Sequence, residues 1–148
     1  MTASYKPPHI PAFVPYFVVR DAQAAIDFYQ KAFGFQLETA CPGEDGSIKH
    51  VEMRFQESVF MFAPEAAFEC FAPEGGNSNP KKSPKTLNVD PSCVFYVYCT
   101  DVDEFFKRAV QEGAKSLIEP NDTFWGDRMC SVVDQDGYEW SFATYKGQ

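Results

Sequence analysis

"FVVRDAQAAIDFYQKAFG", residues 17–34, decides the fold, because its pattern returns as "VYCTDVDEFFKRAVQEG" at residues 97–113. Each copy begins with an apolar strand that ends at an Asp, continues as an amphipathic helix and closes with a Gly. Asp21 and Asp101 are expected to cap the two helices, and the closing Gly to end each helix in the left-handed conformation. The pattern therefore indicates a duplicated module.

Three strand candidates follow each helix, so each half is expected to have the order βαβββ. They are residues 35–40, 48–55 and 59–63 in the first half, and 116–119, 128–133 and 139–144 in the second. A stretch rich in Gly, Pro, Asn and Ser lies between the halves and is typical of a loop. The expected organisation is one domain over 1–148, with modules at 13–64 and 93–146 joined by a linker at 65–92.

Composition excludes several classes of function. The net charge is −8, and the only cluster of basic residues, Lys81, Lys82 and Lys85, lies in the loop, so no nucleic-acid partner is expected. No apolar run approaches the length of a membrane helix, and the N-terminus lacks the apolar core of a signal peptide. Five cysteines without CxxC spacing favour a reducing compartment, so we expect a cytoplasmic protein without disulfides.

Three stretches carry a resemblance to a known family: "PYFVVRDAQAAIDFYQKAFGF" (15–35), "KSPKTL" (82–87) and "FWGDRMCSVVDQDGYEWSFAT" (124–144). With the duplicated module they resemble the vicinal oxygen chelate superfamily, in particular glyoxalase/bleomycin-resistance-like proteins related to a phosphonate-cluster protein. The resemblance implies an α+β fold of two βαβββ modules, each with a curled mixed sheet that encloses a cavity and helices outside. It also implies a homodimer. Members include metal-dependent enzymes and metal-free proteins that sequester drugs, so the fold does not settle function.

Metal-using members of this superfamily bind their ion with side chains on the first and last strand of each module. By that resemblance the four ligand positions here are Val14, Met61, Val94 and Ser141. Such side chains make a poor site for a divalent ion, so we expect no metal and no other cofactor. The His50–Glu52 pair is interpreted as part of a wet cavity wall; if a divalent ion does bind, His50 is expected to be a ligand, because His9 lies in the lead-in segment.

Strand alternation sorts the remaining side chains between the two faces of each sheet. Those expected to pack on the helices are Phe17, Val19, Val51, Met53, Phe55, Phe95, Val97, Cys99, Trp140 and Phe142. The concave wall is expected to hold Tyr16, His50, Glu52, Arg54, Met61, Tyr96, Tyr98 and Glu139. Aromatic rings with a few polar groups are typical of a small-molecule site. The alternative is that the tyrosines only fill a small barrel, with their hydroxyls bonded to neighbours.

A Trp-Gly-Asp-Arg cluster precedes the last hairpin. Gly126 allows a sharp turn, and Asp127 and Arg128 point to opposite faces of a strand, so they cannot easily pair with each other. The favoured interpretation is a structural clamp shielded by Trp125. The alternative is that Arg128 orients a ligand at the cavity mouth, so Trp125 and Arg128 are included among the candidate ligand-binding residues.

The favoured function is therefore a glyoxalase/bleomycin-resistance-like small-molecule-binding protein that lacks the four-ligand metal site. Its acidic balance and aromatic wall would suit a cationic, planar ligand. Two alternatives stay open. One is a metal-dependent lyase, isomerase or dioxygenase that uses His50 and carboxylates. The other is a metal-independent enzyme in which His50 and Glu52 or Glu139 move a proton.

Overall fold

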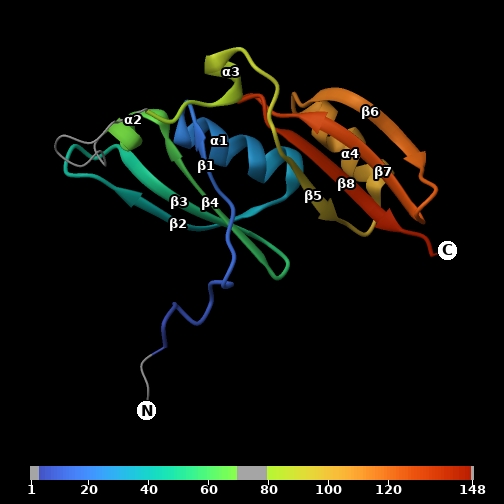
Figure 1. Ribbon diagram of the computed structural model, residues 1–148, viewed down its shortest axis with the longest axis horizontal. Coiled ribbons are helices and arrows are strands. Elements are labelled where there is room, and N and C mark those ends of the chain that lie inside the picture. The colour runs from blue at the N-terminus through green and yellow to red at the C-terminus, as the bar shows by residue number, and fades with distance from the viewer. Residues whose placement is uncertain (1–3, 70–79, 148) are drawn as a thin grey trace.

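The computed structural model describes residues 4–69 and 80–147. The first module runs β1 (Tyr16–Val19), α1 (Ala22–Phe28), η1 (Tyr29–Phe33), β2 (Gln36–Pro42), β3 (Ile48–Phe55) and β4 (Ser58–Pro64). The second runs β5 (Val94–Tyr98), α4 (Val102–Gln111), β6 (Lys115–Asp122), β7 (Asp127–Val133) and β8 (Glu139–Tyr145). Figure 1 shows the two sheets side by side. Over the described residues, no helix has the length and apolar character needed to cross a membrane.

Each module forms one four-stranded mixed sheet, and the strand orders are β1-β4-β3-β2 and β5-β8-β7-β6. The first and last strands of each module pair in parallel, and the other neighbours pair antiparallel. Tyr16 lies opposite Met61, and Tyr96 lies opposite Ser141 at the equivalent place in the second sheet. The predicted α+β fold with two βαβββ modules is confirmed.

Both helices begin and end as their sequences predict. Asp21 accepts a hydrogen bond from the Ala24 N–H at 2.9 Å, and Asp101 accepts one from the Glu104 N–H at 3.1 Å. These bonds satisfy amides that have no partner within the helix. Gly34 follows the π-helical turn η1 with φ 68°, a left-handed conformation that favours glycine. The duplicated strand–cap–helix pattern is thus present in both halves.

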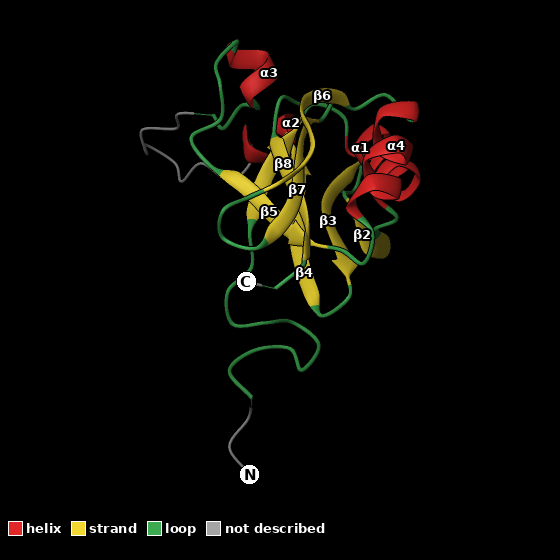
Figure 2. Ribbon diagram, turned by 90° about the vertical axis from the view of Figure 1, so that its right-hand side faces the viewer, coloured by secondary structure: helices red, strands yellow, loops and turns green. Residues whose placement is uncertain are grey.

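One aromatic core, on the helix side of the sheets, joins the modules. The ring centroids of Phe17 and Phe95 are 5.1 Å apart, and those of Phe33 and Phe142 are 4.8 Å apart, so rings from both halves interlock. Figure 2 shows α1 and α4 side by side, and the Arg108 Nε donates to the Ala32 carbonyl at 3.1 Å. A fully buried Phe stabilises the fold by roughly 1.5–3 kcal/mol. The side chains predicted to face the helices line this core.

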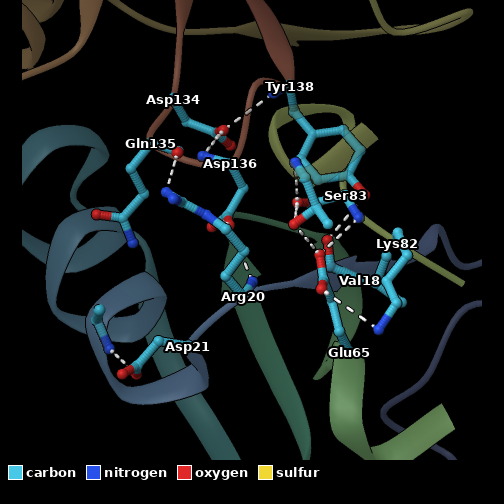
Figure 3. A network of polar contacts seen from close by, with 12 residues as sticks. Val18, Arg20, Asp21, Glu65, Lys82, Ser83, Asp134, Gln135, Asp136 and Tyr138 are labelled. Carbon is cyan, nitrogen blue, oxygen red and sulfur yellow. Dashed lines mark hydrogen bonds and ion pairs between the residues drawn. The ribbon is translucent and has the colours of Figure 1, made fainter. Parts of the chain in front are cut away.

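The turn between β7 and β8 connects the second module to the first (Figure 3). Asp136 is buried, and its Oδ1 accepts from the backbone N of Arg20 at 2.9 Å and from the Arg20 Nε at 3.0 Å. The Arg20 Nη2 also donates to the Gln135 carbonyl. The Tyr138 hydroxyl donates to the Val18 carbonyl at 2.8 Å. These contacts fix the end of β1 against the second sheet.

Asp134 lies buried at the same joint and accepts four hydrogen bonds. Its Oδ2 accepts from the Tyr29 hydroxyl at 2.7 Å and from the Trp140 Nε1 at 2.8 Å. Its Oδ1 accepts from the backbone N–H groups of Asp136 at 2.9 Å and Tyr138 at 3.0 Å. Burial raises the pKa of Asp134 to about 6, although the hydrogen bonds favour the ionised form and limit the rise.

The carboxyl of Asp134 is therefore expected to titrate near pH 6 in the folded protein. An unfolded Asp titrates at about 3.9, so the folded state holds this proton more tightly. The stability that protonation of Asp134 adds is then fully present below about pH 4 and is lost as the pH rises through about 6. Carbon-13 NMR of the carboxyl signals measures the midpoint. A titration midpoint below pH 4 would show that the hydrogen bonds, and not burial, decide the pKa of Asp134.

The linker contains more structure than its composition predicts. It forms two short helices, α2 (Glu65–Glu69) and α3 (Pro84–Leu87), and Ser83 before α3 is completely buried. The Ser83 N–H donates to Glu65 at 2.9 Å, and the Lys85 N–H donates to the Asp136 carbonyl at 2.9 Å. The prediction of a loop over the Gly-, Pro-, Asn- and Ser-rich stretch 74–92 was therefore wrong for α3. Residues 70–79 of the linker lie outside the described residues.

Candidate functional site

The candidate ligand-binding residues form two clusters, one on each sheet. In the first module, contacts join Tyr16 to His50 and His50 to Glu52. In the second, Tyr96, Tyr98 and Trp125 converge on one carboxylate, that of Asp127. Within each module the candidate side chains are therefore linked by hydrogen bonds, and their joint role in one ligand-binding wall stays a prediction.

Asp127 organises the second cluster. It is 2% exposed, and its Oδ2 accepts from the Tyr96 hydroxyl at 2.8 Å, the Tyr98 hydroxyl at 3.0 Å and the Trp125 Nε1 at 3.0 Å. The three aromatic side chains are themselves 43%, 54% and 43% exposed. A buried negative charge is thus enclosed by rings that solvent or a ligand can reach.

Hydrogen bonding sets the charges in this cluster. Burial acts to raise the pKa of Asp127, but the bonds from Tyr96, Tyr98 and Trp125 outweigh it and hold that pKa below its ordinary value. Burial and the bond to Asp127 raise the pKa of Tyr96 to about 12. The bond to Asp127 is also the main cause that raises the pKa of Tyr98. At neutral pH the cluster therefore holds one carboxylate and two neutral phenols.

A tight turn before β7 places Asp127. Gly126 has φ 97°, and a Cβ there would lie 2.9 Å from the Gly147 carbonyl oxygen, so the turn requires glycine on both counts. Thr123 closes the turn, because its hydroxyl donates to the Asp127 carbonyl at 2.9 Å and accepts from the Asp127 N–H at 3.1 Å. The predicted sharp turn at Gly126 is confirmed.

Tyr96 and Tyr98 also line a small cavity between the modules. Its volume is about 180 Å³, and the turn between β3 and β4 of the first module forms the other wall. The residues around it are Phe35, Phe55, Gln56, Glu57, Ser58, Phe60, Tyr96, Val97, Tyr98 and Trp140. An apolar cavity of about 150 Å³ holds a benzene ring, so this space suits a single aromatic ring, with Glu57 among the residues that line it.

Arg128 points to the other face of β7, as alternation predicts. Its Nε and Nη2 form a bidentate pair with Asp103 of α4 at 2.7 and 2.9 Å, and its Nη1 donates to Asp122 at 3.1 Å. The clamp therefore joins a strand to the helix of the same module. A role of Arg128 in ligand binding stays a prediction. The Trp125 indole N–H is bonded to Asp127, and the shielding of the clamp by Trp125 stays a prediction.

The first module carries the other cluster. The Tyr16 hydroxyl lies 3.3 Å from the His50 Nδ1, and the His50 Nε2 lies 3.3 Å from the Glu52 Oε1. His9 of the lead-in segment reaches the same carboxylate, with its Nε2 3.9 Å from the Glu52 Oε2. Arg54 is held by Glu38 at 2.9 Å and by the His9 carbonyl at 3.0 Å. His9 thus belongs to this cluster, although the sequence placed it outside the site.

Glu139 lies apart from both clusters. It lines a groove of about 900 Å³ beside α3, together with Lys85, Lys115 and the β7–β8 turn. The structure thus gives it no contact with His50 or with Asp127. Met61 faces the first cluster, because it pairs with Tyr16 on one side and Glu52 on the other.

The metal-ligand positions of the superfamily do not fit a metal in this chain. Met61 offers one thioether, and the Ser141 hydroxyl is engaged with Ser131 at 2.6 Å. Val14 and Val94 offer no donor atom. Within residues 4–69 and 80–147, no three His, Cys, Asp or Glu side chains are grouped so that they could hold a metal ion. Divalent transition metals require several N, O or S donors around one point.

Protein purified without chelator is accordingly expected to carry well below one equivalent of zinc, nickel, manganese or iron. Metal analysis after incubation with each ion measures this. If an ion does bind, we expect the His50→Ala variant to lose it, since His50 is the donor that suits a transition metal best in the concave faces. A stoichiometric ion that survives this substitution would contradict both expectations.

Two mixed sheets that share an aromatic core define a two-module α+β protein. A family model described as "Glyoxalase/Bleomycin resistance protein/Dioxygenase superfamily" matches residues 9–142. An uncharacterized protein of Mycobacterium bovis is 37% identical over 131 residues, which are 88% of this chain and 81% of that protein. The chain therefore belongs to the glyoxalase/bleomycin resistance protein/dioxygenase superfamily.

Solved structures show the same architecture. TioX from Micromonospora sp. ML1 is 25% identical with a TM-score of 0.67, and the match covers 89% of this chain and 96% of that one. The fosfomycin resistance protein FosX from Listeria monocytogenes, solved with Mn(II) and sulfate, is 12% identical with a TM-score of 0.65. That match covers 91% of this chain and 90% of FosX, and it shows the fold alone.

Sequence reasoning missed two carboxylates that matter most. Asp127 was assigned to the clamp, yet it alternates along β7 with Met129 and Ser131, and this period places it on the same face as the tyrosines. Asp134 bonds to Tyr29, 105 positions away, and no local pattern indicates such a partner.

Cys130 is a buried core residue. Burial raises the pKa of its thiol to about 11, so the thiol is not an activated nucleophile.

Proposed function

We propose that the protein binds a small organic cation that carries an aromatic ring, at the face formed by Tyr96, Tyr98, Trp125 and Asp127. One observation carries the proposal: three exposed aromatic side chains all donate to one buried carboxylate oxygen. The function is binding of a small molecule, without the metal site that other superfamily members use.

The direction of the hydrogen bonds selects the charge of the ligand. The Tyr96 and Tyr98 hydroxyls both donate their single hydrogen to Asp127. Toward a ligand, both hydroxyl oxygens can therefore act only as hydrogen-bond acceptors. A ligand at these hydroxyls must therefore donate, as an ammonium or amidinium group does. An anionic ligand would meet only acceptors and the negative charge behind them.

The rings add to this preference. Tyr96 and Tyr98 have centroids 5.6 Å apart at 64°, and Phe124 stands at 90° to Trp125 with a centroid distance of 4.9 Å. The faces of such rings attract cations, by about 0.5–2 kcal/mol each. A net charge of −8 also raises the local concentration of cations near the protein.

Membership of the superfamily supports a small-molecule site but does not choose between binding and catalysis. The description of the family includes resistance proteins as well as enzymes. A metal-dependent reaction would need donors that the four expected positions do not supply. A metal-independent acid/base enzyme is the second candidate, and the Tyr16–His50–Glu52 contacts favour it.

Calorimetric titration with three probes of one shape tests the proposal: benzylammonium, benzyl alcohol and benzoate. The cation is expected to bind at least about tenfold more tightly than the anion, with the alcohol between them. Equal or tighter binding of benzoate would refute the cation site. No detectable binding of any probe at millimolar concentration would also count against it.

We also propose the homodimer that the resemblance implies. Exposed apolar side chains on the second module, outside the proposed cation site, support it: Val94, Leu117 and Ile118. Sedimentation velocity is expected to give twice the 16.7 kDa of one chain, and a purely monomeric boundary would contradict the proposal.

A closer relation to a phosphonate-cluster protein stays a prediction from the resemblance.

A further inference from the structure

A row of side chains across the first sheet links a hydroxyl, an imidazole and a carboxylate. Tyr16 on β1 and Glu52 on β3 both pair with Met61 of the strand between them, so the register places them in one row. His50 lies two residues before Glu52 and so shares its face. Its ring connects the two, at 3.3 Å from the Tyr16 hydroxyl and 3.3 Å from the Glu52 Oε1.

The chemistry of the three groups assigns the protons. An ionised Glu52 only accepts, so the His50 Nε2 must carry the hydrogen that faces it. In the neutral imidazole the other nitrogen, Nδ1, then has a free lone pair, and the Tyr16 hydroxyl donates to it. Tyr16, His50 and Glu52 thus supply a hydroxyl, a base and a carboxylate that orients the base. The same order of groups activates nucleophiles in unrelated folds.

We propose that Tyr16 is a nucleophilic tyrosine, activated by His50 and oriented through Glu52, that accepts acyl or sulfonyl groups from small electrophiles. In the step the phenol oxygen bonds to the electrophilic centre, and the phenol proton passes to the His50 Nδ1. The bond to the leaving group breaks, and that group departs with the electron pair. Glu52 stabilises the imidazolium that forms.

The surroundings leave the Tyr16 side chain accessible and the base in place. Tyr16 is 46% exposed, and its ring contacts the rings of His50 and Phe68, each with a centroid distance of 5.6 Å. His9 approaches the other oxygen of Glu52 at 3.9 Å, so the carboxylate is flanked by two imidazoles. Arg54 is bound to Glu38 and does not compete for Glu52.

Burial raises the pKa of Tyr16, so the phenolate does not form without help. A base is therefore required for reaction at neutral pH, and His50 is the group within reach. The contacts of 3.3 Å are long for strong hydrogen bonds, and such bonds commonly tighten when a reactant binds. This site is on the first sheet, so its activity does not depend on the cation site of the second.

Labelling with phenylmethanesulfonyl fluoride at pH 7.5, followed by peptide mass spectrometry, tests the proposal. Tyr5 and Tyr145 are 87% and 64% exposed and serve as references within the same molecule. Tyr16 is expected to react at least about tenfold faster than either, although it is the least exposed of the three. A Tyr16 rate no higher than that of Tyr145 would overturn the proposal.

Substitutions at His50 and Glu52 test whether Tyr16 reacts fast because His50 activates its hydroxyl or only because its side chain is exposed. His50→Gln is expected to reduce the ratio of Tyr16 to Tyr145 labelling to the reference level, and Glu52→Gln to reduce it severalfold. Glu38→Gln, on the same module but paired with Arg54, is the matched control and should leave the ratio unchanged. Thermal melting confirms that each variant is folded. Fast labelling of Tyr16 that persists in a folded His50→Gln protein would refute the role of His50.

Discussion

Asp134→Asn is expected to lower the free energy of unfolding at pH 7 by about 3 kcal/mol, within the range for breaking a buried charged network. The carboxylate accepts from four donors, two on each oxygen. An amide replaces one acceptor oxygen by an N–H₂ group. The Trp140 indole can only donate, so it loses its acceptor, whereas the Tyr29 hydroxyl can rotate.

Chemical denaturation and thermal melting measure this loss. For a chain of this length about 3 kcal/mol corresponds to a fall of roughly 6–12 °C in Tm. Asp90→Asn is the matched control, because Asp90 is exposed and the change should stay within about 0.5 kcal/mol. A variant at Asp134 as stable as the wild type would show that the joint between the modules does not rest on this carboxylate.

Asp127→Asn is expected to weaken the binding of benzylammonium at least about tenfold, to the affinity of benzyl alcohol. The substitution keeps the size of the side chain but removes the charge behind Tyr96 and Tyr98. Binding of benzyl alcohol should change little. The same calorimetric titration measures all three probes, and the melting curve reports whether the variant is folded.

Asp122→Asn provides the control in the same hairpin. Asp122 has a side chain that is 77% exposed and is paired with Arg128, so its charge is screened from the tyrosines by solvent. Its loss should leave the affinity for benzylammonium within about twofold. Equal effects of the two substitutions would indicate that the general negative charge of the protein, and not Asp127, attracts the ligand.

Local patterns predict the frame of this protein well. Asp21 and Asp101 are recognisable as helix caps because a cap bonds within three residues of itself. Strand alternation places Phe17 and Trp140 in the core correctly, because a period of two assigns every second side chain to one face. These signals depend only on neighbours in sequence.

The site depends on contacts that sequence neighbours do not report. Arg20 and Asp136 are 116 positions apart, and Asp127 meets Tyr96 across 31. The proline-rich lead-in segment placed His9 outside the expected site, yet that segment contacts Arg54 and Glu52. Ser83 is buried and bonded to Glu65 and Thr86 within a stretch whose composition is that of a loop. Tertiary contacts therefore decided these positions.

The most direct test of the cation site is nitrogen-15 NMR of the two tryptophan indole N–H signals during titration with benzylammonium. The chain has two tryptophans, and the Trp125 indole is bonded to Asp127 at the proposed site, while the Trp140 indole is buried against Asp134. We expect the Trp125 signal to shift with the probe concentration and the Trp140 signal to stay in place. A Trp125 signal that does not move at saturating benzylammonium would contradict the proposed function.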